Sequence, residues 1–180
     1  MRQMRSTYKI YNPEGVFFIT STIVDWLPVF TSPPYFEILF ESIRFSQLKK
    51  GLKLYAYVFL DNHFHLIVSA HNLSNVIGSV KGYTAKEIIR NLKEDKNETL
   101  LEKFRLAKRK YKTKSEFQVW QESFHPQELV SEKIIQQKID YIHMNPVRRG
   151  LVGEPEDWKY SSAGNIISGI EGVLHLNGWD

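Results

Sequence analysis

The stretch KLYAYVFLDNHFHLIVSA, residues 53–70, decides the fold of this chain of 180 residues. Two runs rich in aromatic and β-branched side chains, 53–60 and 63–70, flank the polar pair Asp61-Asn62. Such runs are typical of β-strands, and a short polar break between two of them is typical of a hairpin. The stretch therefore predicts two antiparallel strands joined by a tight turn.

The sequence on either side of this hairpin predicts two more strands and three helices. We expect the strands at 16–24 and 117–121, and the helices at 35–50, 74–92 and 132–145. Gly51 is suited to end the first helix, Ser131 to cap the last, and Pro146 to stop it. The order β-α-β-β-α-β-α predicts an α+β fold, a ferredoxin-like sandwich in which helices pack on an antiparallel sheet.

The composition is that of a globular protein, with 42% hydrophobic residues, 24% charged residues and no cysteine. Disulfides and thiolate chemistry are therefore excluded. No apolar run approaches the ~18 residues of a membrane span, and the basic start at 1–5 lacks the apolar stretch of a signal peptide. We expect a single cytoplasmic domain over 1–180 that has no membrane partner and is a monomer or a homodimer.

Positive charge is concentrated in the middle of the chain. The net charge is +4, yet the segment 103–114 has seven basic residues and no acidic one. We expect this segment to be a loop, and the glycine-rich tail over about 150–180 to be irregular. Phe104 and Tyr111 lie among the basic residues, a combination that suits a phosphate backbone with unpaired bases. A solvated, mobile loop would have the same composition.

The tripeptide His63-Phe64-His65 is the most specific feature of the hairpin. Residues two apart share one face of a strand, so both imidazoles are expected on the surface-facing side and Phe64 on the other. Two imidazoles supply two ligands of a facial metal site that needs a third from elsewhere. Such a pair is also compatible with a purely structural role.

The last predicted helix has two stripes of side chains. Its buried stripe comprises Ile135, Ile139 and Ile142, and a second stripe comprises Gln137, Tyr141 and Asn145. Tyr141 stands one turn before Asn145, so the two side chains should lie along one face. Two interpretations fit this pair. Tyr141 is an aromatic side chain at the edge of the core and Asn145 caps the helix, or Tyr141 supplies a phenol held beside Asn145 as a metal ligand.

Taken together, these motifs resemble those of a known family. The motifs are His63-Phe64-His65, Trp120-Gln121, DYIHMNPVRRGLV at 140–152 and DWKYSS at 157–162. In this order, over roughly 16–162, the chain resembles the REP-associated tyrosine transposases, which belong to the HUH superfamily of single-strand DNA transposases.

The resemblance implies a role for each matching residue. It implies His63, His65 and Asn145 as ligands of Mg²⁺ or Mn²⁺, and Tyr141 as a nucleophile that forms a 5′-phosphotyrosine on single-stranded or hairpin (REP-like) DNA. The chain departs from the family at Asp61, where proline is common, a change expected to alter only the turn. A second departure, near Glu122, where a basic residue is common, puts in doubt DNA contacts along that edge.

Three groups of basic residues are candidates for contacts with the DNA backbone. They are Lys81, Lys86 and Arg90 on the second helix, Lys108, Arg109 and Lys110 in the basic segment, and Arg148 and Arg149 after the last helix. Each group also fits an ordinary solvated surface.

Two other functions remain open at this point. A nucleic-acid-binding module without catalysis would leave the histidine pair incidental. A metal-dependent phosphodiesterase that uses water would keep the metal but not the role of Tyr141. A denaturing gel separates the three, because only the tyrosine enzyme leaves a covalent protein–DNA band.

Overall fold

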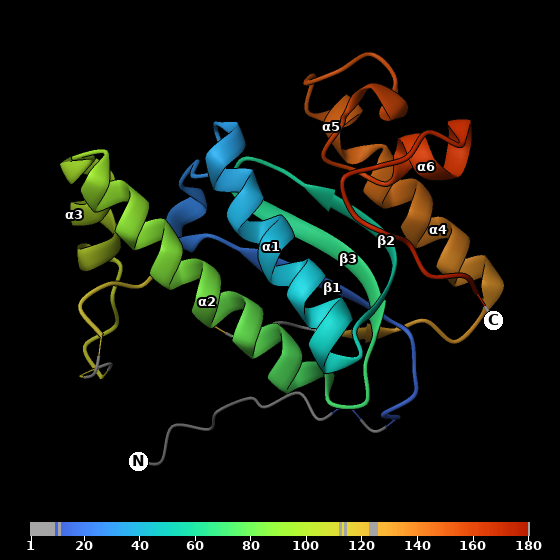
Figure 1. The fold of residues 1–180 in the computed structure, drawn as a ribbon, viewed down its shortest axis with the longest axis horizontal. Helices are drawn as coiled ribbons and strands as arrows, with labels where there is room; N and C mark the ends of the chain where they lie inside the picture. The colour runs from blue at the N-terminus through green and yellow to red at the C-terminus, as the bar shows by residue number, and fades with distance from the viewer. Residues whose placement is uncertain (1–9, 11, 112, 114, 123–125, 180) are drawn as a thin grey trace.

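The computed structural model describes residues 10, 12–111, 113, 115–122 and 126–179. Its sheet has four strands in the order β2-β3-β1-β4, and each neighbouring pair is antiparallel (Figure 1). The strands are β1 (Phe17–Thr22), β2 (Lys53–Phe59), β3 (His63–Ser69) and β4 (Gln127–Glu128). This strand order is the ferredoxin-like one, so the α+β prediction is confirmed.

The predicted hairpin is present as β2 and β3. The Leu60 amide donates to the His63 carbonyl at 2.9 Å, which closes the turn around Asp61-Asn62. β3 lies between β2 and β1, and it pairs with β1 so that Thr22 is opposite His63 and Thr20 opposite His65. The histidine pair is therefore carried by an inner strand with neighbours on both sides.

Helices cover both faces of the sheet. α1 (Pro33–Lys50) and α2 (Leu73–Glu94) pack on one face, and α4 (Glu132–His143) lies on the other (Figure 1). The side chains of β3 alternate accordingly, because Phe64 joins the core under α1 and α2 while Ile67 joins the smaller core with Ile139 and Ile142. Of the helices in the described part of the chain, none has both the length and the apolar character of a membrane span.

The helix ends follow the predicted signals, with one difference. Gly51 ends α1 in the left-handed conformation at φ 63°, and the Ser131 hydroxyl accepts from the Ile134 amide at 3.4 Å to cap α4. α4 ends at His143, and after Met144 a new turn, α5 (Asn145–Arg148), begins. Pro146 lies in the first turn of α5, where proline is tolerated because the amide hydrogen that it lacks has no partner there anyway. Pro146 therefore begins a new turn as well as following the end of α4.

The strand predicted at 117–121 is wrong. Trp120 forms only an isolated bridge with Ile23, and the fourth strand is β4, which pairs with Phe17 and Phe18 of β1. The apolar pattern at 117–121 reflects burial instead, since Val119 and Trp120 lie in the main core at 3% and 5% exposure. Phe124, a possible extension of that strand, lies outside the described residues.

The loop predicted at 103–114 is partly wrong. Its first four residues belong to a helix, α3 (Glu98–Leu106), which the Asn97 side chain caps by accepting from the Leu100 amide at 3.1 Å. Phe104 is fully buried, so it is a core residue and cannot stack on a base. Lys112 and Lys114 lie outside the part of the chain that the structure describes.

The tail predicted to be irregular contains the short helices η2 (Pro155–Asp157) and α6 (Ala163–Ser168). It also covers the free edge of β2. The Tyr57 amide donates to the Ser162 hydroxyl at 2.9 Å, and the Leu54 amide donates to the Asn177 side chain at 2.9 Å. An open strand edge invites pairing with another chain, and the tail blocks that pairing here.

Candidate active site

His63 and His65 share one face of β3, as predicted. Their ring centroids lie 4.9 Å apart, whereas Phe64 points to the opposite face and contacts Trp120 at 5.4 Å. The prediction of surface-facing imidazoles is wrong, because the two residues are only 7% and 5% exposed. Packing of α4 and of the segment after β1 against this face accounts for the burial.

Asn62 fixes the orientation of the His63 ring. Its amide nitrogen donates to the Trp26 carbonyl at 2.9 Å, which turns its oxygen toward His63 Nδ1 at 2.7 Å. Because an amide oxygen only accepts, His63 Nδ1 carries the proton and Nε2 keeps its lone pair. This is the arrangement by which a neighbouring group prepares an imidazole for a metal.

His65 has one satisfied ring nitrogen and one that is not. Nδ1 lies 2.7 Å from the Thr20 hydroxyl, while the buried Nε2 has no hydrogen-bond partner among the described residues. Leaving a buried polar atom unsatisfied costs about 1–3 kcal/mol, so such an atom calls for an explanation. A divalent cation on this nitrogen would supply one, and the donor set of two neutral imidazoles fits such an ion.

Burial keeps both imidazoles neutral. Burial and, to a smaller extent, the nearby Arg149 guanidinium lower the pKa of His63 to about 4, and the Asp61 carboxylate opposes this change. Burial likewise lowers the pKa of His65 to about 3, with repulsion from His63 and Lys138 adding to it. At neutral pH both rings are therefore uncharged, which is the form of an imidazole that binds a cation.

α4 places Tyr141 directly against this pair. The phenol ring meets the edge of His65 at 5.3 Å and the edge of Phe18 at 5.9 Å, and it remains 39% exposed. Lys138 and Arg148 flank the same ring, with their charged groups 5.9 Å and 5.6 Å from its centroid. Tyr141 is thus accessible to solvent, next to an imidazole, and within 6 Å of two cations.

Asn145 lies four residues beyond Tyr141, at the first position of α5, and is buried at 9% exposure. Within the described ranges, no hydrogen bond joins its amide to either imidazole. The part of the chain that the structure describes also contains no group of three His, Cys, Asp or Glu side chains suited to a metal ion. The role of Asn145 as a third ligand stays a prediction.

An ion pair that the sequence did not predict ties α5 to the hairpin turn. Arg149 Nη1 lies 2.7 Å from the Asp61 carboxylate, and the Asp61 carbonyl accepts from the amides of Val29 and Phe30 at 2.8 Å each. Asp61 therefore does more than alter the turn, because it links α5 to the strand that carries the imidazoles. Arg149 was expected to contact DNA, but in the structure its charge is paired.

Of the other predicted DNA-contacting residues, Arg148 lies beside Tyr141, and the rest are spread over α2 and the segment after α3. Arg90 pairs with Glu87 at 2.6 Å, and Lys81 donates to the Gln121 carbonyl at 2.8 Å. Arg109 lies 3.6 Å from Glu122. Lys86 and Lys110 are exposed, as are Arg90 and Arg109, whereas Lys108 is half-buried. Their contacts with DNA stay predictions.

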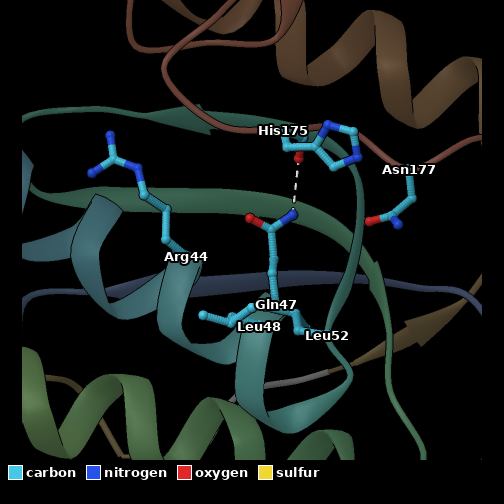
Figure 2. Close-up of a pocket in the computed structure, with 6 residues that line it drawn as sticks. All are labelled: Arg44, Gln47, Leu48, Leu52, His175 and Asn177. Atoms are coloured by element: carbon cyan, nitrogen blue, oxygen red, sulfur yellow. Dashed lines mark hydrogen bonds between the residues drawn. The ribbon is translucent and has the colours of Figure 1, made fainter.

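A pocket on the opposite face of the sheet lies between the end of α1 and the tail. Its lining residues are Arg44, Gln47, Leu48, Leu52, His175 and Asn177 (Figure 2). The Gln47 amide crosses it and donates to the His175 carbonyl at 2.9 Å. This contact holds the tail on α1, so the pocket belongs to the packing of the tail.

Comparison with known proteins gives two matches. Residues 28–145 match the family model described as IS200-like transposases. In structure the chain is similar to a REP-associated tyrosine transposase bound to a REP hairpin, with a TM-score of 0.69 and 18% identity over 97% of this chain and 93% of that chain. No curated protein matches the chain.

The sheet order and the helices on both faces thus define the α+β fold of a tyrosine transposase. The family match covers more than half of the chain and includes the imidazole pair, Tyr141 and Asn145. The chain belongs to the IS200-like transposase family.

Proposed function

We propose that this transposase is a metal-dependent endonuclease and strand transferase for single-stranded DNA, with Tyr141 as its nucleophile. The observation that carries the proposal is the phenol of Tyr141 lying against His65, whose buried Nε2 has no hydrogen-bond partner in the described structure. The ring of a half-exposed hydroxyl nucleophile thus lies against a buried imidazole that has one nitrogen without a partner among the described residues. The family match supports an enzyme that processes DNA.

His63 and His65, together with Asn145, would hold Mg²⁺ or Mn²⁺. When bound, the cation would neutralise charge on the scissile phosphate and polarise it toward attack. Asn62 and Thr20 orient the two rings, and the low pKa values of both histidines keep their lone pairs available. All three ligands are uncharged, so they would leave the positive charge of the ion for the phosphate.

Tyr141 would attack the phosphorus with its phenol oxygen. A tyrosine–phosphate bond forms, the bond to the 3′ oxygen breaks, the phenol proton passes to solvent, and the leaving 3′ oxygen takes up a proton. Lys138 and Arg148 flank the ring, and their charges would bind the phosphate oxygens during this exchange. Because the bond energy stays in the phosphotyrosine, a 3′-hydroxyl can later reverse the step and join strands.

The proposed substrate is a DNA hairpin with a single-stranded flank, in the cytoplasm. The structurally similar transposase is bound to a REP hairpin. A phenol that is 39% exposed can be reached by an unpaired strand. The basic residues of α2, of the segment after α3 and of α5 would contact the backbone of such a strand. We propose that the protein acts as a monomer or a homodimer.

Tyr141→Phe tests the proposal, because it removes one oxygen and retains the ring contacts with His65 and Phe18. With a hairpin taken from beside the chain's own gene and Mn²⁺, the wild type should cleave and leave a covalent band on a denaturing gel. The variant should bind the DNA with unchanged affinity and show neither product. Tyr83→Phe, on the exposed tyrosine of α2, is the matched control and should behave as the wild type. Cleavage by Tyr141→Phe without an adduct would identify a phosphodiesterase that uses water, and wild-type binding without cleavage would identify a binding module.

A further inference from the structure

Trp26 is a large apolar side chain that the core leaves in solvent. It is 57% exposed, whereas its neighbours Val24 and Leu27 are buried at 5% and 8%. The indole makes a T-shaped contact with His63, with the ring centroids 5.5 Å apart. More than half of the Trp26 side chain is therefore open to solvent beside the imidazole pair.

The backbone that presents Trp26 is strained. Asp25 and Trp26 are two consecutive residues in the left-handed region, at φ 52° and 55°, which is unfavourable for side chains with a Cβ. Strain of this kind persists where the surroundings over-determine it, and it concentrates at functional sites. Burial of Trp26 does not explain the strain here, because the indole is exposed.

Hydrogen bonds on both sides hold this turn in place. The Val24 amide donates to the Val119 carbonyl at 2.9 Å, and the Asn62 side chain donates to the Trp26 carbonyl at 2.9 Å. The same Asn62 orients His63, so one side chain links the ring of a candidate metal ligand to the backbone that carries the indole.

We infer that Trp26 is a stacking platform for one unpaired base next to the scissile phosphate. The inference rests on the proposed function and adds to it a residue that sets which nucleotide is seated at the site. An exposed indole offers a rigid π-face to any base, and the fixed link through Asn62 places that base at a constant offset from His63. Trp26 thus sets which nucleotide of the DNA strand lies at the site, while contacts with the phosphate backbone supply the affinity.

Binding measured by fluorescence anisotropy in EDTA tests this without requiring cleavage. The probe is the hairpin with its single-stranded flank, in which one nucleotide at a time is replaced by an abasic site. Trp26→Leu keeps an apolar group against His63 but loses most of the stacking, and Trp26→Phe retains an aromatic face. We expect Trp26→Leu to bind about 5- to 100-fold more weakly, with Trp26→Phe closer to the wild type.

The decisive result is that the effect of Trp26→Leu depends on the base at one nucleotide position of the DNA. A single abasic site should weaken the wild type as much as Trp26→Leu does, and should have no further effect on that variant. Trp179→Leu is the matched control. Trp179 lies in the tail and is 48% exposed, but its ring stacks on Tyr55 of β2. Equal losses at every position, or equal behaviour of Trp26→Leu and Trp26→Phe, would overturn the inference and make Trp26 a shield for His63. If the wild type shows this coupling between Trp26 and one base but does not cleave DNA with Mn²⁺, the role of Trp26 stands. The proposed nuclease activity is then refuted.

Discussion

At the scale of single residues, the unsatisfied Nε2 of His65 is the feature with the clearest consequence. A ligand that binds only the folded state raises the thermal midpoint. Mn²⁺ should therefore raise the Tm of the wild type, and His65→Ala should abolish that increase. The variant will also start from a lower Tm, because a buried ring is lost, so the shift and not the Tm itself is the measurement.

His175→Ala is the matched control for this experiment, since His175 is exposed in the tail. It should keep the full Mn²⁺ shift. A His65→Ala protein with an undiminished shift would show that the ion binds elsewhere, whatever the activity of the enzyme.

The residues of the site were predictable to different degrees. The spacing of His63 and His65 on a strand was enough to place both rings on one face, and this prediction is confirmed. The helical spacing of α4 could orient Tyr141 but could not show that it meets His65, because that contact depends on how α4 crosses the sheet. Trp26 and the Arg149–Asp61 pair join segments far apart in sequence, and no local pattern indicates either.

At the scale of elements, local signals were reliable where they had a local cause. Gly51 and Ser131 act on their own helix ends, and both predictions are confirmed. At 117–121 the apolar pattern has a tertiary cause, since Val119 and Trp120 cover the core without forming a strand. The sequence shows that such residues are buried but not which hydrogen bonds their backbone makes.

The basic segment is the element whose interaction with DNA is most directly measurable. Replacing Lys103, Lys108 and Lys110 together by Gln should reduce the salt dependence of single-strand binding, with the slope of log K against log salt decreasing by ~0.7 per lost phosphate contact. The lysines lie at the end of α3 and just after it, so the fold should be retained. Binding isotherms at several salt concentrations give the slope.

The control for this variant carries the same change of net charge. Replacing Lys49, Lys50 and Lys53 by Gln alters the end of α1 and the start of β2, and should leave the slope near that of the wild type. Equal slopes for both triple variants would mean that the basic segment is solvated surface without DNA contacts.

At the scale of the whole molecule, three buried histidines make stability depend on pH. Burial lowers the pKa of His63 and His143 to about 4 and that of His65 to about 3. The unfolded chain takes up protons near pH 6.5 while the folded chain does not, so the free energy of unfolding decreases as pH falls from about 6.5 toward 4. The slope can reach about 1.4 kcal/mol per pH unit for each histidine.

Urea unfolding between pH 6.5 and pH 5 measures this slope. His143→Gln removes one titrating group away from the imidazole pair, and the slope should then be about one third smaller. His143 Nε2 lies 2.9 Å from the Ser162 hydroxyl, so the variant will also be less stable at every pH, and only the slope is informative. An unchanged slope would show that His143 takes up protons equally in the folded and the unfolded chain.

The tail that covers β2 also affects how the chain is made. Asn177 reaches Leu54 across 123 positions of sequence, and Ser162 reaches Tyr57 across 105. A ribosome therefore releases β2 long before the residues that seal its edge. Until synthesis ends, the nascent sheet exposes unpaired amides to neighbouring chains, and a message truncated before residue 162 would yield a product that sticks to its own copies.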